Sequence, residues 1–84
     1  MKIEMGKVKD YNGHYGKIIT NNKIYTFLNI DVFEQETIEN DDYVLFRGEF
    51  INGTYRAYFV KFFSKNINDF NNKELLRKAV MKGS

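Results

Sequence analysis

Residues 6–28 read GKVKDYNGHYGKIITNNKIYTFL, and their pattern is the strongest indication of the fold in this sequence. Apolar and aromatic residues alternate loosely with polar ones along it, and Asn12-Gly13 and Asn21-Asn22 interrupt the alternation. Asn-Gly is a strong signal for a tight turn between two strands. Gly6, inside the first strand, is typical of a bulge or sharp bend, which suits a small barrel. The stretch predicts three consecutive β-strands, at residues 2–11, 15–20 and 23–29.

The third of these strands alternates between two kinds of side chain. Ile24, Thr26 and Leu28 lie on one face, and Tyr25 and Phe27 lie on the other, because successive side chains of a strand point to opposite faces. We expect the aliphatic set to fill the barrel. The two rings are then expected to face outward or to cover one end.

The rest of the chain predicts a long connection followed by a hairpin. Residues 30–42 are irregular and acidic, with a helical turn expected near 32–36. Residues 43–50 and 54–63 are predicted as two strands, and Asn52-Gly53 again favours a tight hairpin between them. The residues expected in the core of this hairpin are Val44, Phe46, Ala57 and Val60. Three strands, a long loop and a hairpin follow the order of the five-stranded OB barrel, so the predicted fold class is all-β.

Composition limits the kind of chemistry that the chain can perform. A chain of 84 residues forms one domain, and its 17% aromatic content supplies the large side chains that a small core needs. There is no Cys and one His, so disulfides, ordinary zinc knuckles and Cys- or Ser-His catalytic sets are excluded. There is no Gly-rich phosphate loop, and the acidic residues lack calcium-loop spacing. We expect a binding protein with no catalytic residues, metal or cofactor.

The chain also lacks the segments that direct proteins to membranes. No stretch is apolar for long enough to span a bilayer, and the N-terminus has no signal-peptide apolar region. A cytoplasmic protein without membrane association is therefore expected.

Charge is unevenly distributed along the chain. Six acidic residues and no basic residue lie between positions 31 and 42. The rest of the chain contains five acidic residues and all 13 basic residues. Outside this acidic segment the net charge is therefore about +8. A basic body with one acidic loop fits a polyanion that binds away from the loop. The alternative is that the charges only solvate a small protein.

The sequence resembles the cold-shock domain family over residues 6–63. The resemblance is carried by Gly6-Lys7-Val8-Lys9, Tyr11-Asn12, Tyr15-Gly16 before Ile18, and Ile24-Tyr25, with residues 53–60 in the place of the last strand. Cold-shock domains are five-stranded OB barrels that bind single-stranded RNA and DNA. They stack bases on two aromatic motifs in strands two and three, so the resemblance implies the same fold and ligand here.

The sequence departs from the family at several ring positions. Asp10 stands where the family carries an exposed Trp, and Lys17 replaces the second ring of the first motif. In the second motif Tyr25 matches a ring, Phe27 stands at the family's His, and Leu28 stands at its last Phe. A reduced set of stacking rings implies weaker binding or a changed ligand.

The expected site combines the remaining rings with neighbouring cations. The resemblance implies base stacking on Tyr15, Tyr25 and Phe27, each contributing about 1–3 kcal/mol, while Tyr11 matches a ring that is partly structural. Each of these residues also has an ordinary interpretation, as a core ring or a solvated lysine. The expected nucleic-acid-binding residues are Lys7, Lys9, Tyr11, His14, Tyr15, Lys17, Tyr25, Phe27 and Arg56.

Residues 64–84 are an extension beyond the predicted barrel of residues 1–63. Asn71 and Glu74 have the spacing of a helix N-cap and its reciprocal partner. An apolar stripe follows, formed by Leu75, Leu76, Ala79 and Val80. We expect a short amphipathic helix, which must pack on the barrel, on a second copy or on another protein because a helix of this length is marginal alone.

Two functions from different classes are consistent with the sequence. The first is a cold-shock-like module that binds single-stranded RNA or DNA, favoured by the lysines around Val8 and by Tyr15 and Tyr25. The alternative is a protein-interaction module or inhibitor, for instance from a phage or mobile element, that docks through the acidic segment or the C-terminal helix. Asp10 and Lys17 favour this alternative.

Overall fold

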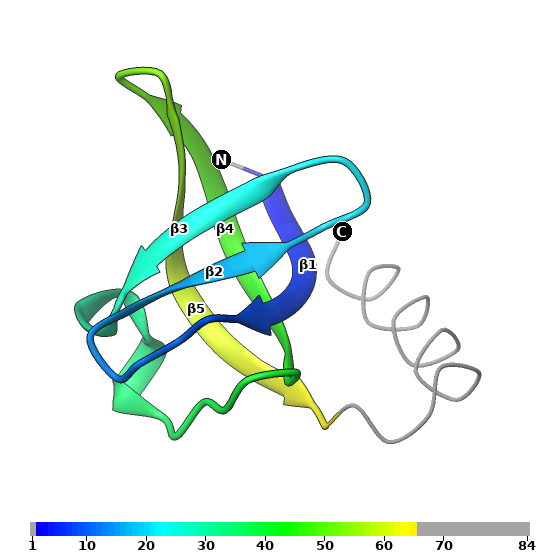
Figure 1. Cartoon of the computed structure of the whole chain (residues 1–84), viewed down its shortest axis with the longest axis vertical. Helices are drawn as coiled ribbons and strands as arrows, with labels where there is room; N and C mark the ends of the chain where they lie inside the picture. Colours follow the sequence, from blue (N-terminus) through cyan, green and yellow to red (C-terminus); the bar gives the residue numbers. More distant parts are fainter. Residues whose placement is uncertain (1, 66–84) are drawn as a thin grey trace.

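Five strands close into a barrel in the computed structural model, which describes residues 2–65 (Figure 1). The strands are β1 (Lys2–Lys9), β2 (Tyr15–Ile19), β3 (Ile24–Leu28), β4 (Tyr43–Ile51) and β5 (Thr54–Ser64). Two short 3-10 turns, η1 (Asn29–Asp31) and η2 (Phe33–Gln35), follow β3. The all-β prediction and the five strands are therefore confirmed. The expected C-terminal helix lies outside the described residues.

The barrel closes because β1 pairs with two neighbours. The strand order is β1-β2-β3-β5-β4, with β1 antiparallel to both β2 and β4 and β3 parallel to β5. The expected turns are present. The Asn12 side chain accepts hydrogen bonds from the backbone N–H groups of His14 (2.9 Å) and Tyr15 (3.0 Å). Asn52 and Gly53 both have positive φ, 52° and 78°, as the tight hairpin turn requires.

The face expected for β3 is wrong. Tyr25 and Phe27 point into the barrel with 2% and 0% of their surface exposed, while Ile24 and Leu28 lie outside with 57% and 39% exposed. The pairing with β2 explains which side chains of β3 face the core, because Tyr25 lies opposite Ile18, whose side chain is fully buried. A change of one residue in phase moves every side chain of a strand to the other face.

Glycines make the space that the two inward rings occupy. A Cβ atom added to Gly16, which pairs with Phe27, would lie 3.0 Å from that ring and 2.8 Å from the Cβ of Tyr11. A Cβ atom added to Gly48 would lie 2.7 Å from Cε2 of Tyr25. A buried ring removes more apolar surface from water than an aliphatic side chain does. The rings are therefore buried in the barrel where glycines leave room for them.

The core contains the residues expected from the hairpin together with residues from every other part of the barrel. Its buried members are Val8, Ile18, Tyr25, Phe27, Val32, Ile38, Val44, Phe46, Ala57 and Val60. Val32 and Ile38 show that the acidic segment is anchored to the barrel by its apolar side chains.

The helical turn expected near residues 32–36 is present in an unusual form. Glu34 and Gln35 have left-handed backbone angles, with φ of 50° and 51°. The two 3-10 turns have three residues each, so within residues 2–65 no helix is of a length that could cross a membrane.

Candidate nucleic-acid interface

The outer face of β1 and β2 brings together four of the expected residues. Lys9 lies directly opposite Lys17, and Lys7 lies opposite Ile19. Tyr15 is on the same side of β2 as Lys17 and has 56% of its surface exposed. We call these five residues the lysine face. It combines positive charge with one accessible ring, as single-stranded ligands require.

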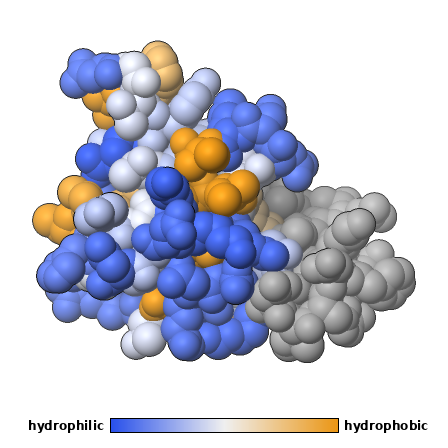
Figure 2. Space-filling model, in the orientation of Figure 1, coloured by the Kyte–Doolittle hydropathy of each residue, from blue (hydrophilic) through white to orange (hydrophobic). Residues whose placement is uncertain are grey.

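Apolar surface continues from the lysine face onto β3. Ile19 and Ile24 lie opposite each other on β2 and β3 and are 40% and 57% exposed. Figure 2 shows a patch of apolar surface in orange near the centre of this view, with hydrophilic surface in blue around it. Exposed aliphatic side chains therefore border the lysine face on β3.

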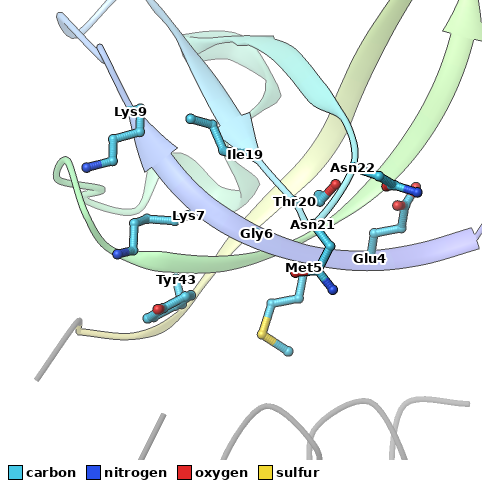
Figure 3. A pocket seen from close by; sticks show the side chains of 10 residues that line it. All are labelled: Glu4, Met5, Gly6, Lys7, Lys9, Ile19, Thr20, Asn21, Asn22 and Tyr43. Carbon is cyan, nitrogen blue, oxygen red and sulfur yellow. The ribbon is translucent and has the colours of Figure 1, made fainter. Parts of the chain in front are cut away.

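A hollow of about 610 Å³ adjoins the lysine face between β1, the first residue of β4 and the turn between β2 and β3. Figure 3 shows Lys7, Lys9 and Tyr43 along one side of this hollow and Asn21 and Asn22 along the other. The Nζ atom of Lys7 lies 5.4 Å from the centre of the Tyr43 ring, a cation–π distance. Tyr43 was not expected at this site from the sequence, because its position opposite Lys7 depends on how β4 pairs with β1.

Nearby carboxylates offset the repulsion between the lysines of the lysine face. Lys9 and Lys17 are directly opposite, an arrangement that destabilises a sheet when nothing offsets the repulsion. Lys9 donates a hydrogen bond to Asp41, which lowers the pKa of that carboxyl, and Lys17 lies 3.8 Å from Asp10. Both ion pairs are exposed, and exposed ion pairs contribute little to stability.

Arg56 does not join the lysine face. It lies on β5 and is separated from Lys17 by Thr26 of β3. Its Nη2 atom is 2.7 Å from the mostly buried Asp31 carboxylate, and its guanidinium lies 5.0 Å from the centre of the Tyr58 ring. Arg56 therefore connects η1 to β5, and we assign it a structural role.

Tyr25 and Phe27 offer no ring face to a base, so the expectation that they point outward is corrected. The hydroxyl of Tyr25 donates a hydrogen bond of 2.5 Å to Glu4. Burial, followed by this hydrogen bond and the Glu4 charge, raises the pKa of Tyr25 to about 12. Tyr11 lies 5.0 Å from Phe27 between ring centres and is half-buried, which makes it part of the rim of the core.

His14 lies in the turn that precedes Tyr15 and is exposed. Its backbone is fixed on both sides: the N–H donates to the Asn12 side chain, and the carbonyl oxygen accepts a 2.8 Å hydrogen bond from Asn29. This fixes the backbone of His14 directly before the exposed Tyr15, at the start of β2. A contact to a nucleic acid is compatible with that position.

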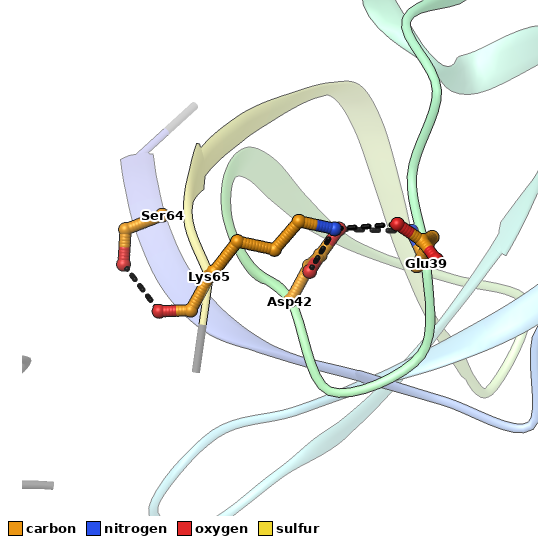
Figure 4. Close-up of polar contacts among 4 residues, drawn as sticks. All are labelled: Glu39, Asp42, Ser64 and Lys65. Atoms are coloured by element: carbon orange, nitrogen blue, oxygen red, sulfur yellow. Dashed lines mark hydrogen bonds and ion pairs between the residues drawn. The ribbon is translucent and has the colours of Figure 1, made fainter. Parts of the chain in front are cut away.

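Several carboxylates of the acidic segment pair with cations from other parts of the chain. Asp42 is 2% exposed, and its side chain accepts a hydrogen bond from the backbone N–H of Glu39 and pairs with Lys65 at 3.2 Å (Figure 4). Lys65 also pairs with Glu39 at 2.5 Å, which lowers the pKa of Glu39 and raises that of Lys65. Much of the charge separation seen in the sequence is therefore balanced by local ion pairs.

Comparisons of the chain with protein-family models, curated proteins and solved structures find no match. In the part of the chain that the structure describes, no three His, Cys, Asp or Glu side chains are grouped so that they could hold a metal ion.

Proposed function

We propose that this protein is a single-stranded nucleic-acid-binding module of the OB type, related to cold-shock domains, that holds RNA or DNA on the lysine face and in the adjoining hollow. The observation that carries the proposal is the grouping of three lysines with the exposed ring of Tyr15 on two adjacent strands. The closed five-stranded barrel and its strand order support the OB assignment.

The roles of the side chains follow from their chemistry. Lys7, Lys9 and Lys17 neutralise phosphates, and Tyr15 stacks an unpaired base. Contacts to phosphates carry no sequence information, so we expect weak sequence preference. The buried positions of Tyr25 and Phe27 remove two of the three stacking rings that the resemblance implies. Binding is therefore expected to be weaker than three rings would allow, by several kcal/mol at about 1–3 kcal/mol per base.

Single strands are expected to bind more tightly than duplexes, because a ring on a strand face stacks only on unpaired bases. Three lysine–phosphate contacts predict that the logarithm of the affinity falls with the logarithm of salt concentration with a slope of about −2, at about −0.7 per contact. Fluorescence anisotropy with a labelled 15-nucleotide single strand and the matching duplex measures both. Equal affinities, or a slope near zero, would count against the proposal.

Replacing the exposed ring should affect binding alone. Tyr15→Ala is expected to weaken single-strand binding by about 1–3 kcal/mol, and to change the free energy of unfolding by no more than about 0.5 kcal/mol. Phe50→Ala, which removes an exposed ring near the β4–β5 turn, is the matched control and should bind normally. If Tyr15→Ala instead unfolds the domain, the ring has a structural role and the assigned face is wrong.

A further inference from the structure

A second apolar surface lies between β1, β4, β5 and η2 and shares no residue with the lysine face. It is a groove of about 380 Å³, which we call the phenylalanine groove, lined by Ile3, Phe33, Leu45, Arg47, Phe59 and Lys61, with Phe46 beneath. Phe33, Phe59 and Ile3 are 39%, 59% and 49% exposed. A group of large apolar side chains this exposed marks an interaction site.

The backbone is strained on both sides of the phenylalanine groove. Phe59 has a φ of 53°, which is unfavourable for a bulky residue, and the left-handed Glu34 and Gln35 follow Phe33 directly. Between the pairs Leu45–Lys61 and Arg47–Tyr58, β5 contains one more residue than β4. This bulge leaves Val60 facing the core and Phe59 outside. Strain that keeps a ring in water points to a function for that ring.

Two cations border the exposed rings. The guanidinium of Arg47 lies 5.7 Å from the centre of the Phe59 ring, and Nζ of Lys61 lies 5.4 Å from that of Phe33. Neither cation pairs with a carboxylate of residues 2–65, whereas Lys9 pairs with Asp41. The groove therefore offers positive charge at its edges and apolar surface within.

We propose that the phenylalanine groove docks a segment of a partner protein in which a large apolar side chain is flanked by carboxylates. The apolar side chain packs between Phe33 and Phe59, and the carboxylates pair with Arg47 and Lys61. Charge disfavours the chain's own residues 66–84, which contain four basic and two acidic residues. A nucleic acid is disfavoured because Glu34 adjoins Phe33, and its carboxylate repels phosphate groups at that end of the groove.

Two synthetic peptides test the proposal on the full chain: Glu-Glu-Leu-Phe-Glu-Glu and the same peptide with Lys in place of Glu. We expect the acidic peptide to shift the backbone amide NMR signals of Phe33, Leu45 and Phe59 saturably, and the basic peptide to leave them unchanged. Arg47→Ser combined with Lys61→Ser should weaken acidic-peptide binding at least tenfold. Equal binding of both peptides, no binding, or shifts confined to the lysine face would overturn the proposal.

Phe59→Gly separates docking from folding. Glycine adopts positive φ without strain, so the melting temperature should stay the same or rise, while acidic-peptide binding falls at least fivefold. Phe50→Ala is again the control and should retain binding. A large fall in melting temperature with unchanged peptide binding would assign Phe59 to the core. Wild-type dimers that Phe59→Gly converts to monomers in sedimentation would show that a second copy occupies the groove, which also contradicts the proposal.

Discussion

Phe27→Ala is expected to lower the free energy of unfolding by about 3–5 kcal/mol, as is typical when a fully buried Phe is truncated. Phe27 is fully buried, contacts Tyr11 and fills the space that Gly16 leaves open. Small domains have total stabilities near the lower end of about 5–15 kcal/mol, so a sizeable fraction of the variant should be unfolded at room temperature.

Urea denaturation followed by circular dichroism measures this loss. Tyr15→Ala is the matched control, because it removes an exposed ring from the neighbouring strand and should keep the wild-type midpoint. A Phe27→Ala protein with the wild-type midpoint and weakened oligonucleotide binding would contradict the structure. It would mean that Phe27 faces outward, as the resemblance to cold-shock domains implies.

Tyr25→Phe is expected to lower the free energy of unfolding by about 1.5–3 kcal/mol at neutral pH. The substitution removes the hydrogen bond from the buried hydroxyl to the carboxylate of Glu4, and hydrogen bonds to charged groups contribute about this much. Tyr55→Phe is the control. The centre of the Tyr55 ring lies 5.4 Å from that of Tyr25, and this substitution leaves the hydrogen bond between Tyr25 and Glu4 in place.

Burial of Tyr25, together with the same hydrogen bond, predicts a pH dependence at high pH. The pKa of Tyr25 rises from 10.0 to about 12 on folding, so the folded state favours the protonated phenol. The stability that this group contributes is fully present below pH 10 and is lost as the pH rises toward 12. Urea titrations at pH 8 and pH 11.5 should show wild type approaching Tyr25→Phe at the higher pH. A constant difference between the two proteins would exclude this account of Tyr25.

The positions of the strands and turns could be predicted from the sequence because their signals are local. Asn12-Gly13 and Asn52-Gly53 form the expected turns, and the hairpin residues Val44 and Phe46 are buried as expected. Which face of β3 is buried could not be predicted in this way, because both faces carry apolar side chains and periodicity alone does not distinguish them. Gly16 was the available signal, since a glycine on the inward face of β2 leaves room for a ring opposite it.

The candidate site was only partly predictable because it depends on contacts between distant residues. Lys9 and Asp41 are 32 positions apart, so the carboxylate that accompanies this lysine follows from the folding of the acidic segment. Tyr43 reaches Lys7 only through the pairing of β1 with β4. The exposure of Phe59 depends on a bulge for which the sequence carries no recognisable turn residue.

Whether the lysine face binds single strands is tested most directly by titrating the isotope-labelled full chain with a single-stranded 15-nucleotide oligonucleotide and recording amide chemical shifts by NMR. Binding on the lysine face should give saturable shifts at Lys7, Lys9, Tyr15 and Lys17, and near the hollow beside Tyr43. Shifts confined to the phenylalanine groove, or an unchanged spectrum at millimolar oligonucleotide in low salt, would contradict it.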